Sequence, residues 1–399
     1  MFTDLSQELT NILRFWTEQM LDPQGGFYGQ MRGDGTLVPQ APRGAILNAR
    51  ILWTFSASYR VTGQAQYLAT ATHALRYILQ HFVDREQGGT YWEVDAQGRP
   101  TNMRKQFYAQ AFMLYGLTEY VRATVDHPQC EALRTEALAL AWQLFDLIER
   151  YSREPRYGGY IEACTRDWGE MDDMRLSVLD LNYPKSQNTH LHILEAFTNL
   201  LRTPGAEDRR AEVAQAQRHL IGIFLDHILN AQTMHLDLFF DMDWQRGGAH
   251  SESYGHDIEF SWLLHEAALV LGDQQVLERV EPIVRAVAQA ATQGLNADGS
   301  MTHEANLDTG YREPDRHWWV QAETVVGYHN IYRHFGDEAS LERSQRCWQY
   351  IRQHLIDRDR GEWYWSCDEA GNPNLADDHA GFWKCPYHNA RMCLELLTW

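Results

Sequence analysis

Apolar residues recur along the chain at the spacing of amphipathic helices. In the first twenty residues they stand mostly three or four positions apart, on one face of a helix with about 3.6 residues per turn; they are Leu5, Leu9, Ile12, Leu13, Trp16 and Met20. Comparable stripes occur at 44–61, 65–83, 104–124, 128–151, 188–203, 208–229, 256–271, 274–293, 317–335, 338–355 and 386–397. Together with the first stripe, they predict twelve helices.

Short segments that contain Gly, Asp or Asn stand between successive pairs of these helices. The segments begin at Gly25, Gly88, Tyr157, His235, Gly299 and Gly361. Each mixes apolar and polar residues with turn-forming residues, as a short β-hairpin does. Their starts lie 63, 69, 78, 64 and 62 residues apart. This spacing indicates six divergent repeats of a helix pair.

Six helix pairs can close into a ring. Closure predicts an all-α fold, an (α/α)6 barrel or toroid of six helical hairpins. Inner helices would line a central cavity, and the short β-hairpin loops would gather at one rim. Because no Pro/Gly/Ser-rich linker and no abrupt change of composition divides the chain, residues 1–399 are predicted to form a single catalytic domain. An open solenoid of twelve helices is the structural alternative.

Composition and charge narrow the class of partner. With 44% hydrophobic and 22% charged residues, the chain is typical of a globular protein with a sizeable core. The 35 Lys and Arg against 54 Asp and Glu give a net charge of −19, which argues against binding to nucleic acid or to an anionic membrane. The 14 Trp, 19 Tyr, 15 Phe and 18 His suit a sugar-binding cleft as well as a core.

The start of the chain and its cysteines indicate a compartment. Asp4 and Glu8 stand where a secretory signal has positive charge, and no apolar run approaches 18 residues. We therefore expect a cytoplasmic protein. The six cysteines form no Cys-x-x-Cys pair, so reduced, structural thiols are expected.

Candidate catalytic groups lie at the starts of several predicted helices. Asn188, His192 and Glu195 can share one helical face, and His256 and Glu259 stand three positions apart. A carboxylate at that spacing can orient an imidazole and raise its basicity, although such a pair can also be a surface ion pair. No His-Glu-x-x-His motif and no Cys/His cluster occurs, so a metal site is the weaker interpretation.

The remaining candidates fall on other predicted inner helices. They are Arg50 and Tyr108 on two apolar stripes, Trp319 and Glu323 at the start of another, and Trp383 and His388 around the start of the last. An arginine among apolar residues either reaches solvent or faces a polar cavity. In a closed barrel these side chains converge on one cavity mouth, where imidazoles beside an arginine suggest proton transfer on a sugar.

These stretches resemble the N-acylglucosamine 2-epimerase superfamily, most closely its cellobiose 2-epimerase branch. The matching segments are LNARILW (47–53), NTHLHILEAFTNL (188–200), SYGHDIE with SWLL (253–264), HWWVQAETVVG (317–327) and WKCPYHNARMCLEL (383–396). The resemblance implies an (α/α)6 barrel that needs no metal or organic cofactor. The loops QRGGAHSE before Ser253 and HEANLDTGYREP before Asp315 depart from the family, and such loops select the sugar.

The resemblance also implies roles for the candidates. His256 and His388 match the general acid/base pair, and His192 matches a third active-site histidine. Arg50 matches the arginine that stabilises an enediolate. The residues that match substrate contacts are Tyr108, Asn188, Glu259, Trp319 and Trp383. The expected reaction is inversion at C2 of a reducing-end aldose.

Several functions remain open at this point. The first is a 2-epimerase acting on cellobiose-type β-1,4-disaccharides; a D-mannose 2-epimerase and a mannose/glucose aldose–ketose isomerase need the same catalytic residues. An inverting glycosidase needs two carboxylates, for which Glu259, Glu323, Asp241 and Asp243 are candidates. A non-catalytic sugar binder is the last alternative. We expect a small sugar as the ligand and a monomer or weak homodimer.

Overall fold

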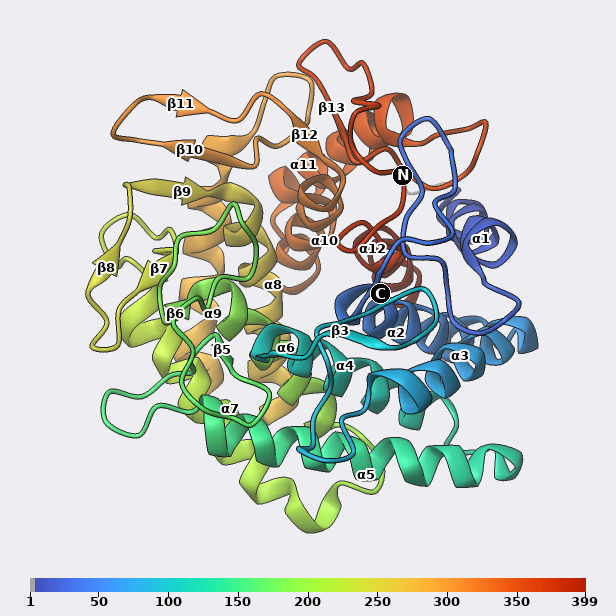
Figure 1. Ribbon diagram of the computed structural model, residues 1–399. Coiled ribbons are helices and arrows are strands. Elements are labelled where there is room, and N and C mark those ends of the chain that lie inside the picture. Colours follow the sequence, from blue (N-terminus) through green and yellow to red (C-terminus); the bar gives the residue numbers. More distant parts are fainter. Residues whose placement is uncertain (1–3) are drawn as a thin grey trace.

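Twelve α-helices alternate between an inner and an outer ring in the computed structural model, which describes residues 4–399 (Figure 1). The inner helices are α2 (Ala45–Thr62), α4 (Phe107–Ala123), α6 (Gln187–Leu201), α8 (Tyr254–Leu271), α10 (Trp318–Phe335) and α12 (Tyr387–Thr398). The outer helices are α1 (Leu5–Phe15), α3 (Ala65–Tyr77), α5 (Glu131–Leu147), α7 (Arg210–Ile223), α9 (Gln274–Ala290) and α11 (Glu338–Tyr350). All twelve predicted helices are confirmed, with small shifts at their ends.

The two rings differ in how they are buried. Every residue of α2 from Ala45 to Ser58 is buried, because an inner helix contacts two inner neighbours, an outer helix and the barrel axis. By contrast, α9 buries only a stripe that includes Val280, Val284 and Val287. An outer helix needs only one apolar face, which explains why its periodicity is clear in the sequence.

The ring closes through contacts between the two ends of the chain. Each inner helix packs against the next one, and α12 packs against both α2 and α1. At the rim, Met31 pairs with Ala380 in an antiparallel bridge. The indole of Trp363 donates a 2.7 Å hydrogen bond to Glu8 on α1. These contacts make a closed (α/α)6 barrel, and they exclude the open solenoid.

Each repeat ends in a tight turn before the chain enters the next inner helix. Five of the outer helices, α1, α3, α5, α7 and α11, finish in a five-residue π-helical turn, and α9 finishes in a 3₁₀ turn. One antiparallel bridge then follows in every repeat: Leu21–Phe27, Val83–Thr90, Arg153–Tyr160, Leu229–Leu236, Leu295–Met301 and Ile356–Trp363. The six predicted hairpin-like loops are therefore present at one rim.

The longer strands connect neighbouring repeats, which the sequence did not predict. The strands are β1 (Arg43–Gly44), β2 (Glu93–Val94), β3 (Pro100–Asn102), β4 (Lys105–Gln106), β5 (Ala163–Cys164), β6 (Lys185–Ser186), β7 (Phe239–Phe240), β8 (Arg246–Gly247), β9 (Ser251–Ser253), β10 (Glu304–Asn306), β11 (Tyr311–Arg312), β12 (Arg316–His317) and β13 (Ser366–Cys367). The antiparallel pairs β1–β2, β4–β5, β6–β7, β9–β10 and β12–β13 each join a strand that enters an inner helix to the following loop. These pairs hold the starts of the inner helices together.

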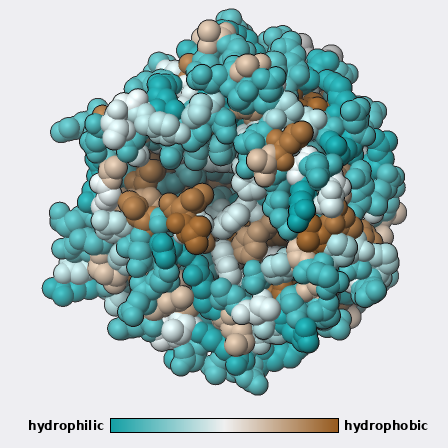
Figure 2. All heavy atoms as spheres, turned by 45° about the horizontal axis from the view of Figure 1, so that its top comes forward, coloured by the Kyte–Doolittle hydropathy of each residue, from teal (hydrophilic) through white to brown (hydrophobic). Residues whose placement is uncertain are grey.

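The rim face is open at its centre. Figure 2 shows a hollow there, with apolar residues beside it. Within the described residues, no helix has both the length and the apolar character that a membrane crossing requires.

Candidate active site

A cavity of about 350 Å³ opens where the inner helices begin. It is lined by nine of the ten predicted site residues, Arg50, Tyr108, Asn188, His192, His256, Glu259, Trp319, Trp383 and His388. The tenth, Glu323, contacts one of them: its Oε1 lies 2.7 Å from Nδ1 of His388. Residues up to about 340 positions apart in the chain thus meet at one place, as the closed ring requires.

His388 is held by a buried carboxylate. Its Nδ1 donates to Glu323 Oε1, while the indole of Trp262 donates to Glu323 Oε2 at 2.9 Å. Glu323 is fully buried. Although burial opposes ionisation, the charge of Arg391 and the contact with His388 hold the pKa of Glu323 at about 2. A carboxylate on Nδ1 fixes the tautomer, so Nε2 is the nitrogen left for the sugar.

His192 has the same kind of support on another helix. Its Nδ1 lies 3.0 Å from Glu195 Oε2, one turn further along α6. The edge of its ring packs on Tyr108, with ring centroids 4.8 Å apart. The spacing of His192 and Glu195 in the sequence placed them on one helical face, and the structure makes them hydrogen-bonded partners.

His256 is oriented differently from the expectation. Its Nδ1 lies 2.8 Å from the hydroxyl of Ser253, at the end of β9. The expectation that Glu259 orients His256 is wrong, because Glu259 Oε1 accepts a 3.0 Å hydrogen bond from Arg391 and lies 3.9 Å from Nδ1 of His388. Glu259 is therefore bonded to Arg391 on α12 and not to His256 on its own helix, α8.

The cavity holds all three imidazoles in the neutral form. Burial lowers the pKa of His256 and of His388 to about 3. Burial also lowers the pKa of His192, although Glu195 opposes the shift. A neutral imidazole has a lone pair on one ring nitrogen and can act as a general base. The carboxylates on Nδ1 of His192 and His388 place that lone pair on Nε2.

Trp319 lies against both members of the predicted acid/base pair. Its ring centroid is 4.8 Å from that of His256 and 5.7 Å from that of His388. The two imidazoles come from α8 and α12 and therefore approach the cavity from different sides of the ring. The indole of Trp319 also lines the cavity, so it is a surface on which an apolar face of a sugar can stack.

Arg50 supplies a positive charge inside the cavity. Its Nη2 donates to the hydroxyl of Tyr108 at 2.9 Å, and its guanidinium lies 4.2 Å from the ring of Phe112 and 4.9 Å from that of Tyr387. These stacked rings hold the guanidinium in place without neutralising it. The prediction that Arg50 faces a polar cavity agrees with this position.

Sequence reasoning did not single out Arg391 and Tyr387, which lie beneath the cavity. Arg391 is fully buried, and its guanidinium bonds Glu195, Glu259 and Glu323. The argument that identified Arg50, a lone arginine among apolar residues, applies equally to Arg391 in HNARMCLELL and could have found it. Nothing in the local sequence indicates the role of Tyr387, whose hydroxyl donates to Glu195.

One group of side chains in the described part of the chain has the proximity of metal ligands. Ligand atoms of Glu259, Glu323 and His388 lie within 4.8 Å of one another. Nη2 of Arg391 donates to both of these carboxylates. The chain therefore already supplies a cation to this pair of acids, and the donor set does not fit an added metal well.

A second chamber adjoins the cavity at the rim. Its volume is about 450 Å³, and it shares Asn188, His256, His303 and His317 with the first. Four residues of the segment 176–180 line both chambers, and Val178 lines the first one only. Val178 and Leu179 are 85% and 92% exposed. The buried Nε2 of His303 has no hydrogen-bond partner in the protein.

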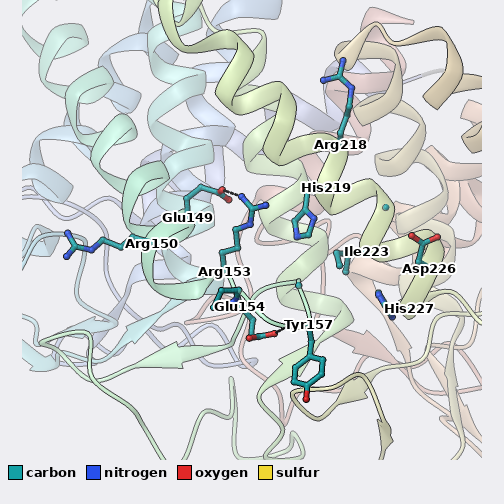
Figure 3. A pocket seen from close by; sticks show the side chains of 13 residues that line it. Glu149, Arg150, Arg153, Glu154, Tyr157, Arg218, His219, Ile223, Asp226 and His227 are labelled. Carbon is teal, nitrogen blue, oxygen red and sulfur yellow. Dashed lines mark hydrogen bonds and ion pairs between the residues drawn. The ribbon is translucent and has the colours of Figure 1, made fainter.

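A larger groove lies on the outer wall, where α5 and α7 end (Figure 3). Its volume is about 810 Å³. The charges there are paired locally, with Arg153 2.8 Å from Glu149 and Arg218 2.9 Å from Asp273. Predicted site residues are absent from its lining. The inner cavity is therefore the candidate for catalysis.

Comparison with known proteins agrees with this geometry. The family model of N-acylglucosamine 2-epimerase (GlcNAc 2-epimerase) matches residues 26–391. The chain belongs to this family. Within the N-acylglucosamine 2-epimerase family, a cellobiose 2-epimerase of Bacteroides fragilis is 52% identical over 396 residues, which cover 99% of this chain and 98% of the relative.

A solved structure supports the same assignment of fold and family. The cellobiose 2-epimerase of Bacillus thermoamylovorans is 37% identical, covers 100% of each chain and superposes with a TM-score of 0.90. A D-mannose isomerase of Marinomonas mediterranea is more distant, at 22% identity over 412 residues that cover 99% of this chain and 96% of the relative.

Proposed function

We propose that this protein is a cellobiose 2-epimerase, an isomerase that interconverts the reducing-end glucose and mannose units of cellobiose-type β-1,4-disaccharides. The observation that carries the proposal is the placement of two neutral imidazoles, His256 and His388, against Trp319 in a cavity that also holds the Arg50 cation. The 52% identity to a cellobiose 2-epimerase over nearly the whole chain supports the choice of substrate.

The reaction begins with ring opening of the reducing sugar. A proton moves from the anomeric hydroxyl to an imidazole, and another is delivered to the ring oxygen, so the C1–O5 bond breaks and an aldehyde forms. His192 is the candidate for this step, because Glu195 orients its ring within the cavity. The aldehyde then acidifies the hydrogen on C2.

Inversion at C2 requires a base on one face of the sugar and an acid on the other. One imidazole of the pair His256 and His388 removes the C2 proton, which leaves a cis-enediolate with negative charge on O1. The Arg50 guanidinium stabilises that oxyanion. The other imidazole takes up a proton from solvent and delivers it to C2 from the opposite face, while the first imidazole releases the abstracted proton to solvent, so both return to the neutral form. General acid/base assistance of this kind is typically worth about 100- to 10,000-fold per step.

The proposed binding mode uses the aromatic residues and the polar groups at the rim. Trp319 and Trp383 stack on pyranose faces, while Tyr108, Asn188 and Glu259 bind hydroxyl groups. Asn188 Oδ1 is buried and has no partner within the protein, so it is free to accept a hydrogen bond from the sugar. The adjoining chamber provides room for the second glucose unit.

Competing functions are weaker for physical reasons. The glycosidase candidates Asp241 and Asp243 stand in a turn where Asp241 Oδ1 accepts from the backbone of Gln245, away from the cavity lining. Glu259 and Glu323 share one guanidinium, so they are not two separately placed acids. A D-mannose 2-epimerase or aldose–ketose isomerase uses the same imidazoles, and the identity of 22% to a D-mannose isomerase favours it less. A mere sugar binder has no use for three carboxylate- or hydroxyl-supported imidazoles.

Product analysis by NMR tests the proposal. Cellobiose, lactose, mannose and glucose are incubated separately with the protein, and the anomeric signals are followed with time. The proposal expects 4-O-glucosyl-mannose from cellobiose. Release of glucose would support the glycosidase, and formation of a ketose from mannose without conversion of cellobiose would support the isomerase.

The proposal includes the setting in which the enzyme works. We expect no metal or organic cofactor, since the chain's own imidazoles and arginine carry every proton and charge in the steps above; full turnover in EDTA is the check. Residues 1–399 act as one catalytic domain, which the contacts of α12 with α1 and α2 support. The protein is cytoplasmic and a monomer or weak homodimer, without nucleic acid or membrane partners.

A further inference from the structure

Buried charges fill the barrel axis directly beneath the cavity. Arg391 on α12 is fully buried, and Glu195, Glu259 and Glu323 are each no more than 2% exposed. They come from α12, α6, α8 and α10. Three acids and one base meet at a depth where an unpaired charge is costly.

The guanidinium of Arg391 contacts these acids through two of its nitrogens. Nη1 donates to Glu195 Oε1 and to the hydroxyl of Tyr387. Nη2 donates to Glu323 Oε1 at 2.6 Å and to Glu259 Oε1 at 3.0 Å. One side chain therefore ties three inner helices to a fourth.

The same carboxylates hold two of the imidazoles. Glu195 bonds Arg391 through Oε1 and His192 through Oε2. Glu323 uses Oε1 for both Arg391 and His388. Each imidazole is hydrogen-bonded to its carboxylate through Nδ1, so the carboxylate determines where Nε2 lies. Arg391 in turn determines where both carboxylates lie.

We propose that Arg391 is a positioning residue, whose guanidinium fixes Glu195 and Glu323 so that His192 and His388 present their Nε2 atoms to the sugar together. This inference rests on the proposed function. It assigns Arg391 no contact with the substrate, since Arg391 is fully buried beneath the cavity. A planar guanidinium can bond several carboxylates along fixed directions, whereas an ammonium group is a single point.

The charge of Arg391 has a separate effect from its shape. The titratable and charged groups around His388 are Glu323 on α10, Glu259 on α8, Arg50 on α2 and Arg391 on its own helix. Burial and the neighbouring Glu323 raise the pKa of Glu259 well above its ordinary value. Those around His192 are Glu195, Arg50 and Arg391, with His256 on the next helix. Arg391 lowers the pKa of both imidazoles. Loss of its charge leaves the carboxylates uncompensated, so both imidazoles should bind protons at higher pH.

Three variants separate shape, charge and simple stability. Arg391→Met removes both the planar guanidinium and its charge, whereas Arg391→Lys keeps the charge and loses the planar group. Arg43→Met is the matched control, because Arg43 is also buried and paired, with Asp22, but belongs to the rim at β1. Turnover of cellobiose is measured against pH, and the pKa of His388 is read by ¹⁵N NMR of labelled histidines, assigned with His388→Gln.

The variants are expected to differ in their effects on kcat and on the pKa of His388. In Arg391→Met, kcat falls on the order of 100-fold with KM changed less than about threefold, and the pKa of His388 rises by about one unit or more. In Arg391→Lys, kcat falls about tenfold while the pKa of His388 stays near that of the natural protein. Arg43→Met shows neither change, whatever it does to the melting temperature.

Any of three results overturns the inference. The first is a kcat for Arg391→Lys equal to that of the natural protein. The second is an unchanged pKa of His388 in Arg391→Met. The third is a loss of activity in Arg391→Met that is uniform with pH and matched by Arg43→Met. If Arg391→Met does not fold, the lysine variant alone decides through its kcat and KM. The NMR measurement needs no turnover, so it distinguishes failure of this inference from failure of the proposed reaction.

Discussion

Nδ1 of His388 lies 2.7 Å from Oε1 of Glu323, a carboxylate that is fully buried on the neighbouring helix α10. The pair joins the last inner helix to the one before it. It determines which nitrogen of His388 is available to the substrate, and so connects closure of the barrel to its chemistry.

Replacing that carboxylate should damage catalysis more than stability. In Glu323→Gln, the amide no longer favours one tautomer of His388, and kcat should fall on the order of 1,000-fold, by analogy with carboxylate–histidine pairs in hydrolases. Steady-state kinetics on cellobiose measures the loss. Glu8→Gln is the control, since Glu8 is also buried and bonded to an indole, that of Trp363, but lies on outer helix α1. Equal kcat values for the two variants would remove Glu323 from the catalytic machinery.

The depressed pKa of the imidazoles predicts how activity depends on pH. Because burial lowers the pKa of His256 and His388 to about 3, both stay neutral well below the ordinary histidine value of 6.5. The acid limb of kcat/KM should therefore have its midpoint below 6.5. A midpoint at or above that value contradicts the neutral-imidazole mechanism.

Stability should follow the same shift with a definite sign. Between the folded pKa and the unfolded value near 6.5, these histidines bind protons in the unfolded chain but not in the folded one. The free energy of unfolding therefore falls as pH falls through this window. Urea unfolding at several pH values measures the slope, which should be smaller in His388→Asn. An identical slope in that variant shows that His388 does not contribute.

Arg50 should matter through its delocalised charge and its geometry. In Arg50→Lys the ammonium cannot stack between Phe112 and Tyr387 or bond along the same directions, so kcat should fall on the order of 100-fold. Tyr108→Phe is the comparison, because it removes only the hydroxyl that Arg50 contacts at 2.9 Å. Steady-state kinetics of both variants measures kcat. If kcat falls no further in Arg50→Lys than in Tyr108→Phe, Arg50 does not stabilise the oxyanion.

Trp383 should affect binding rather than chemistry. Its indole lines the cavity, 6.0 Å from the ring of Tyr108 between centroids. Trp383→Ala should raise KM for cellobiose about tenfold, the equivalent of about 1.4 kcal/mol, with little change in kcat. The control is Trp142→Ala on outer helix α5, where the indole contacts Arg209. If KM is unchanged in Trp383→Ala, the sugar does not stack there.

Helical periodicity accounts for most of what the sequence predicted. The apolar stripes predicted all twelve helices, most clearly the outer ones, because an outer helix needs only one apolar face. The three-residue spacing also placed His192 and Glu195 on one helical face, where they are hydrogen-bonded. The same spacing failed for His256 and Glu259, because the partner of Glu259 is Arg391, 132 positions away. The strand pairs between repeats were missed for the same reason: two-residue strands such as β1 and β2 carry no pattern, and only the closed ring brings them together.

Exchange of the C2 hydrogen with solvent tests the central claim most directly. Cellobiose is incubated in deuterium oxide with the natural protein and with His388→Ala and His256→Ala, and loss of the C2 proton signal is followed by NMR. The account predicts that deuterium enters C2 of both epimers with the natural protein and that exchange is abolished in His388→Ala. Epimerisation without deuterium at C2, or exchange that persists in His388→Ala, would contradict proton transfer by this histidine.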